Sequence, residues 1–350
     1  MTGARAGGNV EEPQAQYARA ACAALRRRRP GGELSDVTSR TGPVARAALS
    51  ALTLAAACNT PPRPPIIPPP YTGNVTIIGH RGASGHAPEH TWASYDAARR
   101  MGAHYIEQDL QRTADRVLII LHDETMDRTL RGDACKGAVN SVAWRTLRRC
   151  DAGTWFNERF TDKARRDFQG EHPIALAELF ARYRDSVRYY IETKKPEEAP
   201  GMERELLDAM QAAGFGAYEA REWRIVIQSF SGASLRTVRA LDKQWPLVQL
   251  MERVPAESNV SAMLDTIATY ANGVGPNRLD VDSAFVAAAH ARCLVVHPYT
   301  VNGEEDMKKL AHAGVDGMFT DYPDRLRAVL ATQGPTRAPR PARCPKLPRY

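Results

Sequence analysis

The sequence predicts an α/β domain of the (β/α)8 barrel type, known as a TIM barrel, over residues 71–333. From Val75 onward, short apolar runs rich in β-branched residues alternate with amphipathic segments, which is typical of parallel strands joined by crossover helices. The strand-like runs number eight, the number that a closed parallel barrel requires.

The eight predicted strands are short and mostly apolar. They are Thr76–Ile78, Tyr105–Asp109, Val117–Leu121, Val187–Ile191, Arg224–Gln228, Leu247–Leu250, Leu294–Val296 and Gly317–Thr320. Gly273–Pro276 is short and rich in glycine, so we expect a loop or a minor strand there.

Amphipathic segments fill most of the gaps and predict helices. They are Thr91–Met101, Ala175–Tyr183, Gly201–Ala213, Gly232–Leu241, Ser258–Tyr270, Asp282–Ala291, Glu304–Ala313 and Asp324–Ala331. Two gaps differ from the rest. Between Asp109 and Val117 there is no room for a helix, so we expect a bare connection. After the third predicted strand comes an insertion, residues 124–171, with weak periodicity, and long insertions in barrels usually carry function.

The positive charge of the chain lies in its ends. The net charge is +7, but residues 1–70 carry nine Lys/Arg against four Asp/Glu, and residues 334–350 carry five against none. The body between them is therefore mildly acidic, which argues against a nucleic-acid partner, since that would need a basic face on the folded domain. We expect residues 334–350 to form a basic, disordered tail.

Residues 1–70 are predicted to be a leader and spacer. Ala47–Ala57 is too short to span a bilayer and is typical of the apolar part of a signal peptide. It ends in Leu54–Cys58, which resembles the lipobox of bacterial lipoproteins, with Cys58 as the lipidated residue. The proline-dense segment Asn59–Pro70 then predicts a stiff spacer.

We therefore expect an exported protein, periplasmic or anchored to a bacterial membrane through Cys58. A disordered Ala-rich leader is the alternative. Because the leader is long for a signal peptide, we expect translation to start near Val37 or Val44.

The remaining cysteines do not suggest a disulfide scaffold in a chain of this length. Cys135 and Cys150 bracket a loop-like segment and could pair in an exported protein, although the sequence leaves this open. Cys293 lies in an apolar run and is predicted to be an inert buried thiol, and Cys344 falls in the tail.

Ionisable residues follow four successive predicted strands. His80 follows the first, Glu107 and Asp109 close the second, His122 closes the third, and Glu192 closes the fourth. In a barrel these strand ends converge on one face. Glu107 and Asp109 are two residues apart on a strand and so point to the same side.

These residues are predicted to form one site. Glu107, Asp109 and Glu192 could together hold one divalent cation, Ca2+ or Mg2+. Taken singly, each has a structural explanation, because acidic residues on strands often face water and lone histidines are usually structural. Their joint placement at strand ends favours a functional site.

A set of motifs makes the prediction more specific. It comprises His80-Arg81-Gly82, Pro88-Glu89-His90-Thr91, Glu107-Gln108-Asp109, His122-Asp123, Asp127-Arg128-Thr129, Glu192-Thr193-Lys194, Gln228-Ser229-Phe230 and Phe319-Thr320-Asp321-Tyr322-Pro323. Together these resemble the signature of the glycerophosphodiester phosphodiesterase family over roughly residues 75–330. Gly273–Pro276 and Val296–Val301 resemble its exported bacterial branch. His90 departs from the pattern, since the family usually has asparagine there, and His90 is not expected to take part in catalysis.

The resemblance implies a role for each matching residue. It implies that Glu107, Asp109 and Glu192 bind the metal and that His80 and His122 are the acid/base pair. Arg81 and Lys194 would bind the phosphate with the metal. Phe230 and Trp155 are candidates to line the site around the glycerol, with core packing as the alternative explanation for both aromatic residues.

The implied activity is the metal-dependent hydrolysis of small phosphodiesters, such as glycerophosphocholine and glycerophosphoethanolamine, to glycerol 3-phosphate and an alcohol. Which histidine is the acid, and whether water or the glycerol 2-hydroxyl attacks, stay open. A phospholipase-type enzyme on the same barrel is one alternative. A surface lipoprotein that binds without catalysis is another, although the intact set of ionisable residues speaks against it.

Overall fold

The computed structural model describes residues 75–255, 257–333 and 340–345. The predicted leader, the lipobox at Cys58, the spacer Asn59–Pro70 and the rest of the tail lie outside these residues. No helix among the described residues is both long and apolar enough to cross a membrane.

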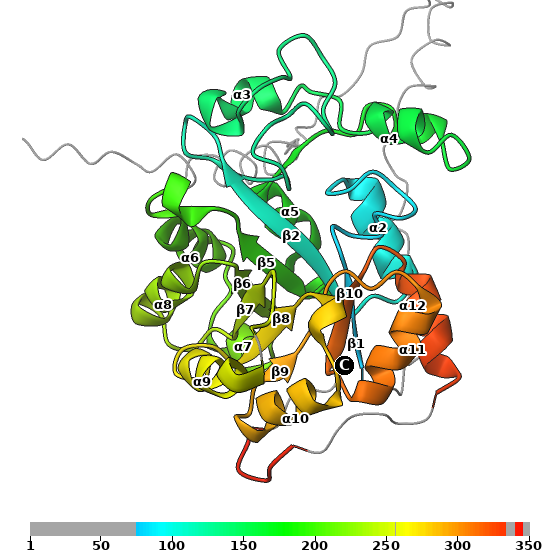
Figure 1. Ribbon diagram of the computed structural model, residues 1–350. Helices are drawn as coiled ribbons and strands as arrows, with labels where there is room; N and C mark the ends of the chain where they lie inside the picture. The colour runs from blue at the N-terminus through cyan, green and yellow to red at the C-terminus, as the bar shows by residue number, and fades with distance from the viewer. Residues whose placement is uncertain (1–74, 256, 334–339, 346–350) are drawn as a thin grey trace, which may run out of the picture.

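The core of the described chain is a barrel of parallel strands (Figure 1). In sheet order they are β10 (Gly317–Thr320), β1 (Thr76–Gly79), β2 (Tyr105–Arg112), β5 (Tyr189–Thr193), β6 (Ile225–Ser229), β7 (Leu247–Met251), β8 (Gly273–Pro276) and β9 (Val295–Val296). Backbone hydrogen bonds join the two ends of this order, from Asp316 N–H to the Val296 carbonyl and from Phe319 N–H to the Pro298 carbonyl. The predicted (β/α)8 class is confirmed.

Helices cover the outside of the barrel (Figure 1). They are α2 (Trp92–Arg100), α5 (Leu176–Tyr183), α6 (Met202–Ala212), α7 (Ala217–Arg221), α8 (Gly232–Leu241), α9 (Glu257–Ile267), α10 (Ser283–Ala291), α11 (Glu304–Ala313) and α12 (Pro323–Ala331). All except the short α7 match predicted helices. Thr91, Ser231 and Asp282 explain where three of them begin, because each side chain accepts a backbone N–H in the first turn.

One predicted barrel strand is wrong. Val117–Leu121 contains β3 (Leu118–Ile120), which runs antiparallel to the second half of β2, with Ile120 opposite Leu110. A tight turn joins the two strands, in which Thr113 N–H donates to the Val117 carbonyl. A connection this short can join only antiparallel neighbours, because parallel strands need a crossover of about a dozen residues. The insertion therefore follows a β2–β3 hairpin rather than a third barrel strand.

The segment predicted as a loop or minor strand supplies the missing barrel strand. Gly273–Pro276 is β8, parallel to β7 and β9. A Cβ atom on Gly273 would lie 2.3 Å from Cγ2 of Val295, and one on Gly275 would lie 2.6 Å from Cδ2 of Leu250. The two glycines therefore make room for the side chains of the neighbouring strands.

The insertion lies beyond the end of β2 (Figure 1). It contains α3 (Trp144–Leu147) and α4 (Thr154–Arg159), and β4 (Ile174–Ala175) returns the chain by pairing with β3. Cys135 and Cys150 form a disulfide inside its small apolar core, so the pairing considered from sequence is present. Short 3-10 helices complete the chain at Val139–Ser141, Arg166–Phe168, Arg184–Ser186, Pro196–Glu198 and Arg278–Asp280.

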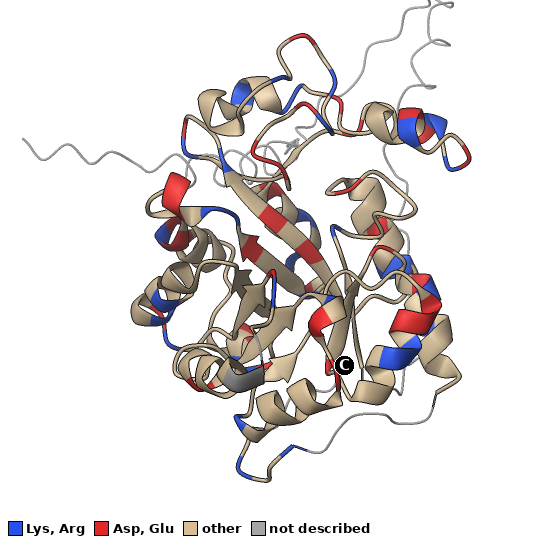
Figure 2. Cartoon of the chain, in the orientation of Figure 1, with Lys and Arg blue, Asp and Glu red and all other residues tan. Residues whose placement is uncertain are grey.

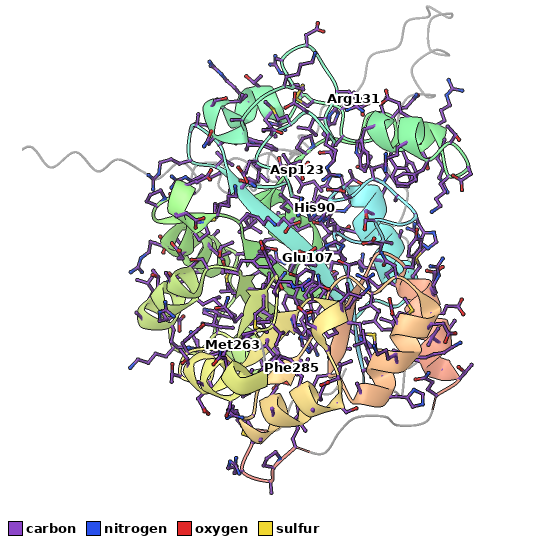
Figure 3. All side chains as sticks on the ribbon, viewed as in Figure 1. His90, Glu107, Asp123, Arg131, Met263 and Phe285 are labelled. Atoms are coloured by element: carbon purple, nitrogen blue, oxygen red, sulfur yellow. A yellow bond between two sulfur atoms is a disulfide. The ribbon has the colours of Figure 1, made fainter. Side chains whose placement is uncertain are left out.

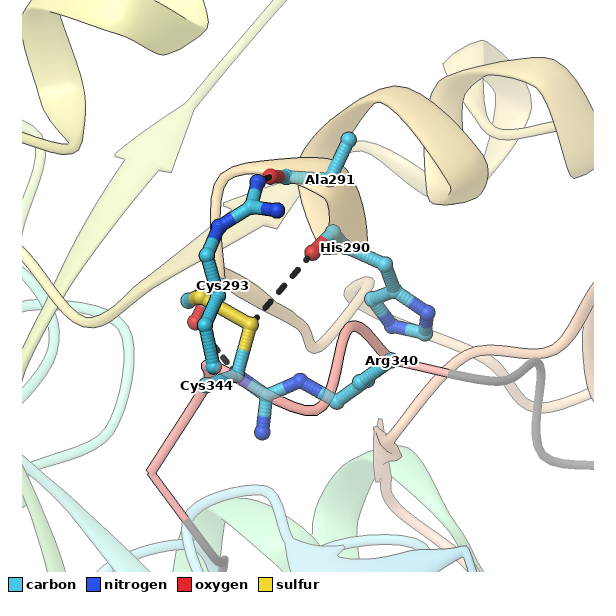
Figure 4. The surroundings of a disulfide bond; sticks show 6 residues. His290, Ala291, Cys293, Arg340 and Cys344 are labelled. Atoms are coloured by element: carbon cyan, nitrogen blue, oxygen red, sulfur yellow. Dashed lines mark hydrogen bonds between the residues drawn. A yellow bond between two sulfur atoms is a disulfide. The ribbon is translucent and has the colours of Figure 1, made fainter.

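The prediction for Cys293 is wrong, because Cys293 forms a disulfide with Cys344 (Figure 4). Arg340 donates to the Cys293 carbonyl and Arg343 donates to the Ala291 carbonyl, so tail residues satisfy carbonyls at the end of α10. Residues 340–345 are therefore fixed to the barrel, and the disorder predicted for the tail does not hold for this part of it.

Candidate active site

Inside the barrel, a polar layer toward the carboxyl ends of the strands (the upper layer) lies above an apolar layer (the lower layer). The lower layer consists of seven buried side chains, Ile78, Tyr105, Tyr190, Val226, Val248, Val295 and Phe319. Because side chains alternate along a strand, residues two positions further on point into the same interior. On six of these strands those residues are polar, namely His80, Glu107, Glu192, Gln228, His297 and Asp321. Figure 2 shows the acidic residues of this layer along β2 and β5.

Three carboxylates meet in the polar layer. Glu107, Asp109 and Glu192 are 1%, 1% and 5% exposed, and Asp109 is paired in register with Glu192. Burial and repulsion from Asp109 raise the pKa of Glu107 and of Glu192 well above the ordinary value. Burial acts in the same direction on Asp109, but Lys194, His90 and Arg81 outweigh it and hold the pKa of Asp109 well below its ordinary value.

His90 also belongs to this cluster, although it was not predicted as a metal-binding or catalytic residue. Its Nε2 lies 2.9 Å from Oδ2 of Asp109, and its Nδ1 lies 2.9 Å from the hydroxyl of Tyr95. Ligand atoms of His90, Glu107 and Asp109 all lie within 4.8 Å of one another. Figure 3 shows His90 between Glu107 and Asp123.

The cluster fits a divalent cation. Three buried carboxylates face two cationic side chains, and Arg81 is shared with a further carboxylate, Glu89, at 3.0 Å. Burial, together with repulsion from Asp109, raises the pKa values of Glu107 and Glu192. Carboxylate oxygens are ligands that Ca2+ and Mg2+ prefer, so a bound divalent cation would complete the charge balance.

The two predicted phosphate-binding residues lie beside the carboxylates. The backbone N–H of Arg81 donates to Oε2 of Glu107 at 2.7 Å, and its Nε lies 3.5 Å from Oδ2 of Asp109. Lys194 Nζ lies 3.1 Å from Oε1 of Glu192 and 3.7 Å from Oδ1 of Asp109. Both cationic groups therefore stand at the mouth of the barrel, where an anionic substrate would meet them.

Each predicted catalytic histidine is held by an aspartate. His80 Nδ1 lies 2.7 Å from Oδ1 of Asp321, and His122 Nδ1 lies 2.6 Å from Oδ1 of Asp123. An ionised partner fixes the proton on Nδ1 and leaves Nε2 to exchange protons. Within the described part of the chain, neither Nε2 has a hydrogen-bond partner. Asp123 and Asp321 were not among the predicted site residues, although Asp123 follows His122 and Asp321 follows the last predicted strand.

Arg128 joins the insertion to the barrel. Its guanidinium makes paired hydrogen bonds with Glu89, at 2.6 and 2.9 Å, and also binds Asp123. Burial opposes ionisation of Glu89, but Arg81 and Arg128 lower the pKa of Glu89 to about 2. This chain of ion pairs runs from the barrel to the partner of His122 and fixes that histidine relative to the carboxylates.

The two predicted aromatic residues have different surroundings. Phe230 is 39% exposed, packs edge-on against Tyr299 with ring centroids 5.8 Å apart, and has Lys194 Nζ 5.9 Å from its ring centre. Trp155 is only 6% exposed and packs against Phe156 under the guanidinium of Arg128. Phe230 therefore offers a surface to a substrate, whereas Trp155 offers little.

Comparisons with known proteins identify the family. A family profile described as the glycerophosphoryl diester phosphodiesterase family matches residues 80–325. A glycerophosphodiester phosphodiesterase of Bacillus subtilis is 41% identical over 255 residues, which cover 73% of this chain and 86% of that relative. The chain therefore belongs to the family that its motifs predicted.

Solved structures agree with the fold. The crystal structure described as a putative glycerophosphoryl diester phosphodiesterase from Silicibacter pomeroyi is 28% identical to this chain, with a TM-score of 0.66. The match covers 77% of this chain and 97% of the Silicibacter pomeroyi chain. A phosphodiesterase from Oleispira antarctica, solved in complex with the product sn-glycerol-3-phosphate, is 24% identical with a TM-score of 0.60, covering 73% and 97% of the two chains. The family profile, the Bacillus subtilis relative and the shared fold together make this chain a member of the glycerophosphodiester phosphodiesterase family.

Proposed function

We propose that the protein hydrolyses glycerophosphodiesters, such as glycerophosphocholine and glycerophosphoethanolamine, to glycerol 3-phosphate and an alcohol, with a divalent cation at Glu107, Asp109 and Glu192. The observation that carries the proposal is a buried carboxylate cluster next to two histidines that aspartates orient. The name of the Bacillus subtilis relative and the product bound in the Oleispira antarctica structure support the same reaction.

The site must balance the charge of a phosphodiester and of a departing alkoxide. A bound divalent cation supplies Lewis acidity and neutralises charge on the phosphate oxygens. Arg81 and Lys194 stand beside the carboxylates and would donate charge-assisted hydrogen bonds to the same oxygens. Positive charge held in place before the reaction stabilises the transition state at little reorganisation cost.

His80 and His122 would divide the proton transfers. One imidazole removes the proton of the nucleophile, and the other protonates the leaving alcohol through its Nε2. Either water or the glycerol 2-hydroxyl can attack, and internal attack would gain from proximity. A cyclic glycerophosphate trapped in a single turnover would identify the internal route.

The activity test uses the purified protein, glycerophosphocholine and added Ca2+ or Mg2+, with release of glycerol 3-phosphate as the measurement. We expect release that stops with excess chelator and falls by at least about 100-fold in His122→Ala. His312→Ala is the matched control, because His312 is exposed on α11 and its Nδ1 contacts the Lys308 carbonyl on the same helix rather than a site residue. Release that survives chelation would refute metal dependence, and no release with either metal would favour a binding role.

We also propose that the protein is exported and anchored by a lipid on Cys58. Support comes from the lipobox-like Leu54–Cys58 and from the two disulfides, which persist in oxidising compartments. Labelling of cells with a radioactive fatty acid tests the anchor. Label is expected on the wild type and not on Cys58→Ser, and equal labelling of both would contradict the proposal.

A further inference from the structure

We propose that the end of the barrel where the strands begin docks on an anionic membrane surface, so that the mouth of the candidate active site faces the water. The docking residues are Arg100, Arg184, Arg224, Lys243 and Arg343, called here the basic face. This inference does not rest on the proposed hydrolysis. It shares a membrane with the anchor proposed at Cys58, but it concerns a contact made by the folded domain itself.

Basic residues gather where the outer helices end and the barrel strands begin. The connections into the strands, with the last turn of the helix before each and residues 340–345, carry twelve Lys/Arg against six Asp/Glu. The basic residues are Arg99, Arg100, Arg182, Arg184, Arg188, Arg221, Arg224, Arg239, Lys243, Arg292, Arg340 and Arg343, and the acidic ones are Asp185, Glu219, Glu222, Asp242, Asp265 and Asp316. Because the body of the chain is mildly acidic as a whole, this excess of positive charge belongs to one end of the barrel.

Most acidic side chains at this end already have partners. Glu222 lies beside Arg221, Asp265 beside Arg292, Asp316 beside His290, Asp242 beside Gln244 and Trp245, and Glu219 beside the Gly216 N–H. Asp185 is the exposed one that remains. Within the described residues, no carboxylate lies at ion-pair distance from the five cations of the basic face.

Backbone carbonyls explain why these arginines gather here. The guanidinium of Arg224 donates to the Asp185 carbonyl, and that of Arg343 donates to the Ala291 carbonyl at 2.5 Å. Figure 4 shows the tail that carries Arg340 and Cys344 against the end of α10. Helices end at this side of the barrel, and their last carbonyls carry partial negative charge that attracts basic residues. A carbonyl does not neutralise a guanidinium, so the basic face keeps its charge towards the solvent.

His104 lies among these cations, just before β2. Burial, with Arg188 and Arg327, lowers the pKa of His104 to about 4, and its Nδ1 lies 2.8 Å from the Ile77 N–H, which it accepts. The imidazole is therefore neutral, and two guanidiniums act on it from different parts of the chain. The positive potential at this end of the barrel thus extends from the connection before β5 to α12.

The entry point of the chain favours a membrane as the partner. Val75 directly precedes β1, so the chain enters the barrel on the side of the basic face. Cys58 lies 17 residues before Val75, a stretch that can span at most about 60 Å. A membrane that holds the chain at Cys58 is therefore brought to this side of the domain. Anionic lipids attract Lys and Arg within about a Debye length of the surface, so the basic face is complementary to it.

The active site lies at the opposite end of the barrel. Glu107, Asp109 and Glu192 lie towards the carboxyl ends of β2 and β5, and the insertion follows beyond β2 (Figure 1). Docking through the basic face therefore leaves the mouth open to the water. A substrate would reach it as a soluble molecule, which suits deacylated phosphodiesters rather than intact membrane lipids.

The test measures binding of the full chain to vesicles by co-sedimentation. The chain carries Cys58→Ser, so that no lipid is attached, and the vesicles contain phosphatidylglycerol and phosphatidylcholine in equal parts. Vesicles of phosphatidylcholine alone give the baseline. The test variant combines Arg100→Gln, Arg184→Gln and Lys243→Gln, which are exposed residues of the basic face.

A second triple variant is the matched control. It combines Lys136→Gln, Arg145→Gln and Arg149→Gln, which are exposed residues of the insertion, and it changes the net charge by the same amount. Residues 1–70 are identical in both variants, so any contribution that they make to binding cancels. Thermal unfolding of each variant confirms that it is folded.

We expect the basic-face variant to bind about 100-fold more weakly, since each basic residue near an anionic surface contributes about fivefold to partitioning. The control should stay within about threefold of the parent. Binding of the parent should also weaken as the ionic strength rises, because salt screens the attraction. Equal losses in both variants, no loss in either, or no binding by the parent would each overturn the proposal. A DNA duplex that binds the same three residues more tightly than vesicles would replace the membrane with a nucleic acid.

Turnover separates this inference from the proposed function. Both triple variants should keep the kcat of the parent on glycerophosphocholine, and a loss confined to the basic-face variant would overturn the docking role. A selective loss of vesicle binding in a protein that never releases glycerol 3-phosphate would support docking and refute the hydrolase proposal. Hydrolysis with unchanged vesicle binding in both variants would do the reverse.

Discussion

Replacing Asp321 by asparagine tests whether His80 works as an oriented proton carrier. Asp321 follows β10, and its Oδ1 accepts the Nδ1–H of His80 at 2.7 Å. Burial opposes ionisation, but His80, Asn302 and Ser84 lower the pKa of Asp321 to about 2, so the carboxylate is charged at every pH of an activity assay. Asp321→Asn keeps the shape of the side chain and removes the charge.

The expected loss follows from the kind of hydrogen bond. A hydrogen bond to a charged group contributes about 1.5–3 kcal/mol, against about 1 kcal/mol for a neutral one. Because Asp321 is ionised, the bond at 2.7 Å belongs to the charged class, and it strengthens when His80 carries two protons during the reaction. Losing about 1–2 kcal/mol of that stabilisation lowers kcat by about 5- to 30-fold, with KM nearly unchanged.

The assay compares kcat and KM of the wild type, Asp321→Asn and Asp324→Asn. Asp324 is the matched control, because it pairs with His86 at 2.9 Å but is about half exposed on α12, outside the site. An Asp321→Asn enzyme with wild-type kcat would refute the orienting role. Equal losses in both variants would show that the effect is not specific to His80.

Three further predictions concern other parts of the molecule. Glu89→Gln should reduce the unfolding free energy at pH 7 by about 3 kcal/mol, since Arg81 and Arg128 lower the pKa of Glu89 from 4.5 to about 2. This stabilisation is present above pH 4.5 and is lost as the pH falls towards 2. Urea unfolding should therefore show the difference in unfolding free energy between the wild type and Glu89→Gln shrinking over that range. A difference that stays constant with pH would contradict the role of the Glu89 charge. Phe230→Ala should raise KM by about 2- to 10-fold. Tyr218→Ala is the control, because Tyr218 is an exposed aromatic residue of α7 away from the site, and it should leave KM unchanged. Equal KM values for the wild type and Phe230→Ala would exclude Phe230 from substrate binding. Cys344→Ser should lower the unfolding free energy by about 2–4 kcal/mol, measured as a lower unfolding temperature. kcat should not change, because Cys293 precedes β9 at the end of the barrel opposite the carboxylates. An unchanged unfolding temperature would show that the disulfide does not stabilise the fold.

The barrel class could be predicted because its signal is local and repeated. Two strands could not be assigned correctly for physical reasons. Val117–Leu121 has the composition of a barrel strand, and only the short link after Asp109 distinguishes a hairpin from a crossover. In β8, Gly273 and Gly275 leave room for the side chains of Val295 and Leu250, and strand propensity does not capture this requirement.

Arg81 and Lys194 could be predicted because they follow β1 and β5, and the three carboxylates because they lie on β2 and β5 where barrel geometry brings neighbouring strands together. Residues outside that rule were missed. His90 lies in the loop after β1 and reaches Asp109 through a backbone of positive φ, which the sequence does not show. Cys293 and Cys344 are 51 residues apart, and spacing alone does not identify disulfide partners.

The β2–β3 hairpin has a consequence for how such enzymes can be recombined. His122 follows β3 of the hairpin that extends the barrel strand β2, whereas Arg128 comes from the insertion and binds Glu89 in the loop after β1. A chimera that receives residues 124–171 from a relative would keep both imidazoles but inherit a foreign partner for Glu89 and Asp123. We therefore expect such grafts to retain activity only when the donor segment carries an arginine at the position of Arg128, because that arginine must pair with Glu89 and Asp123 of the recipient.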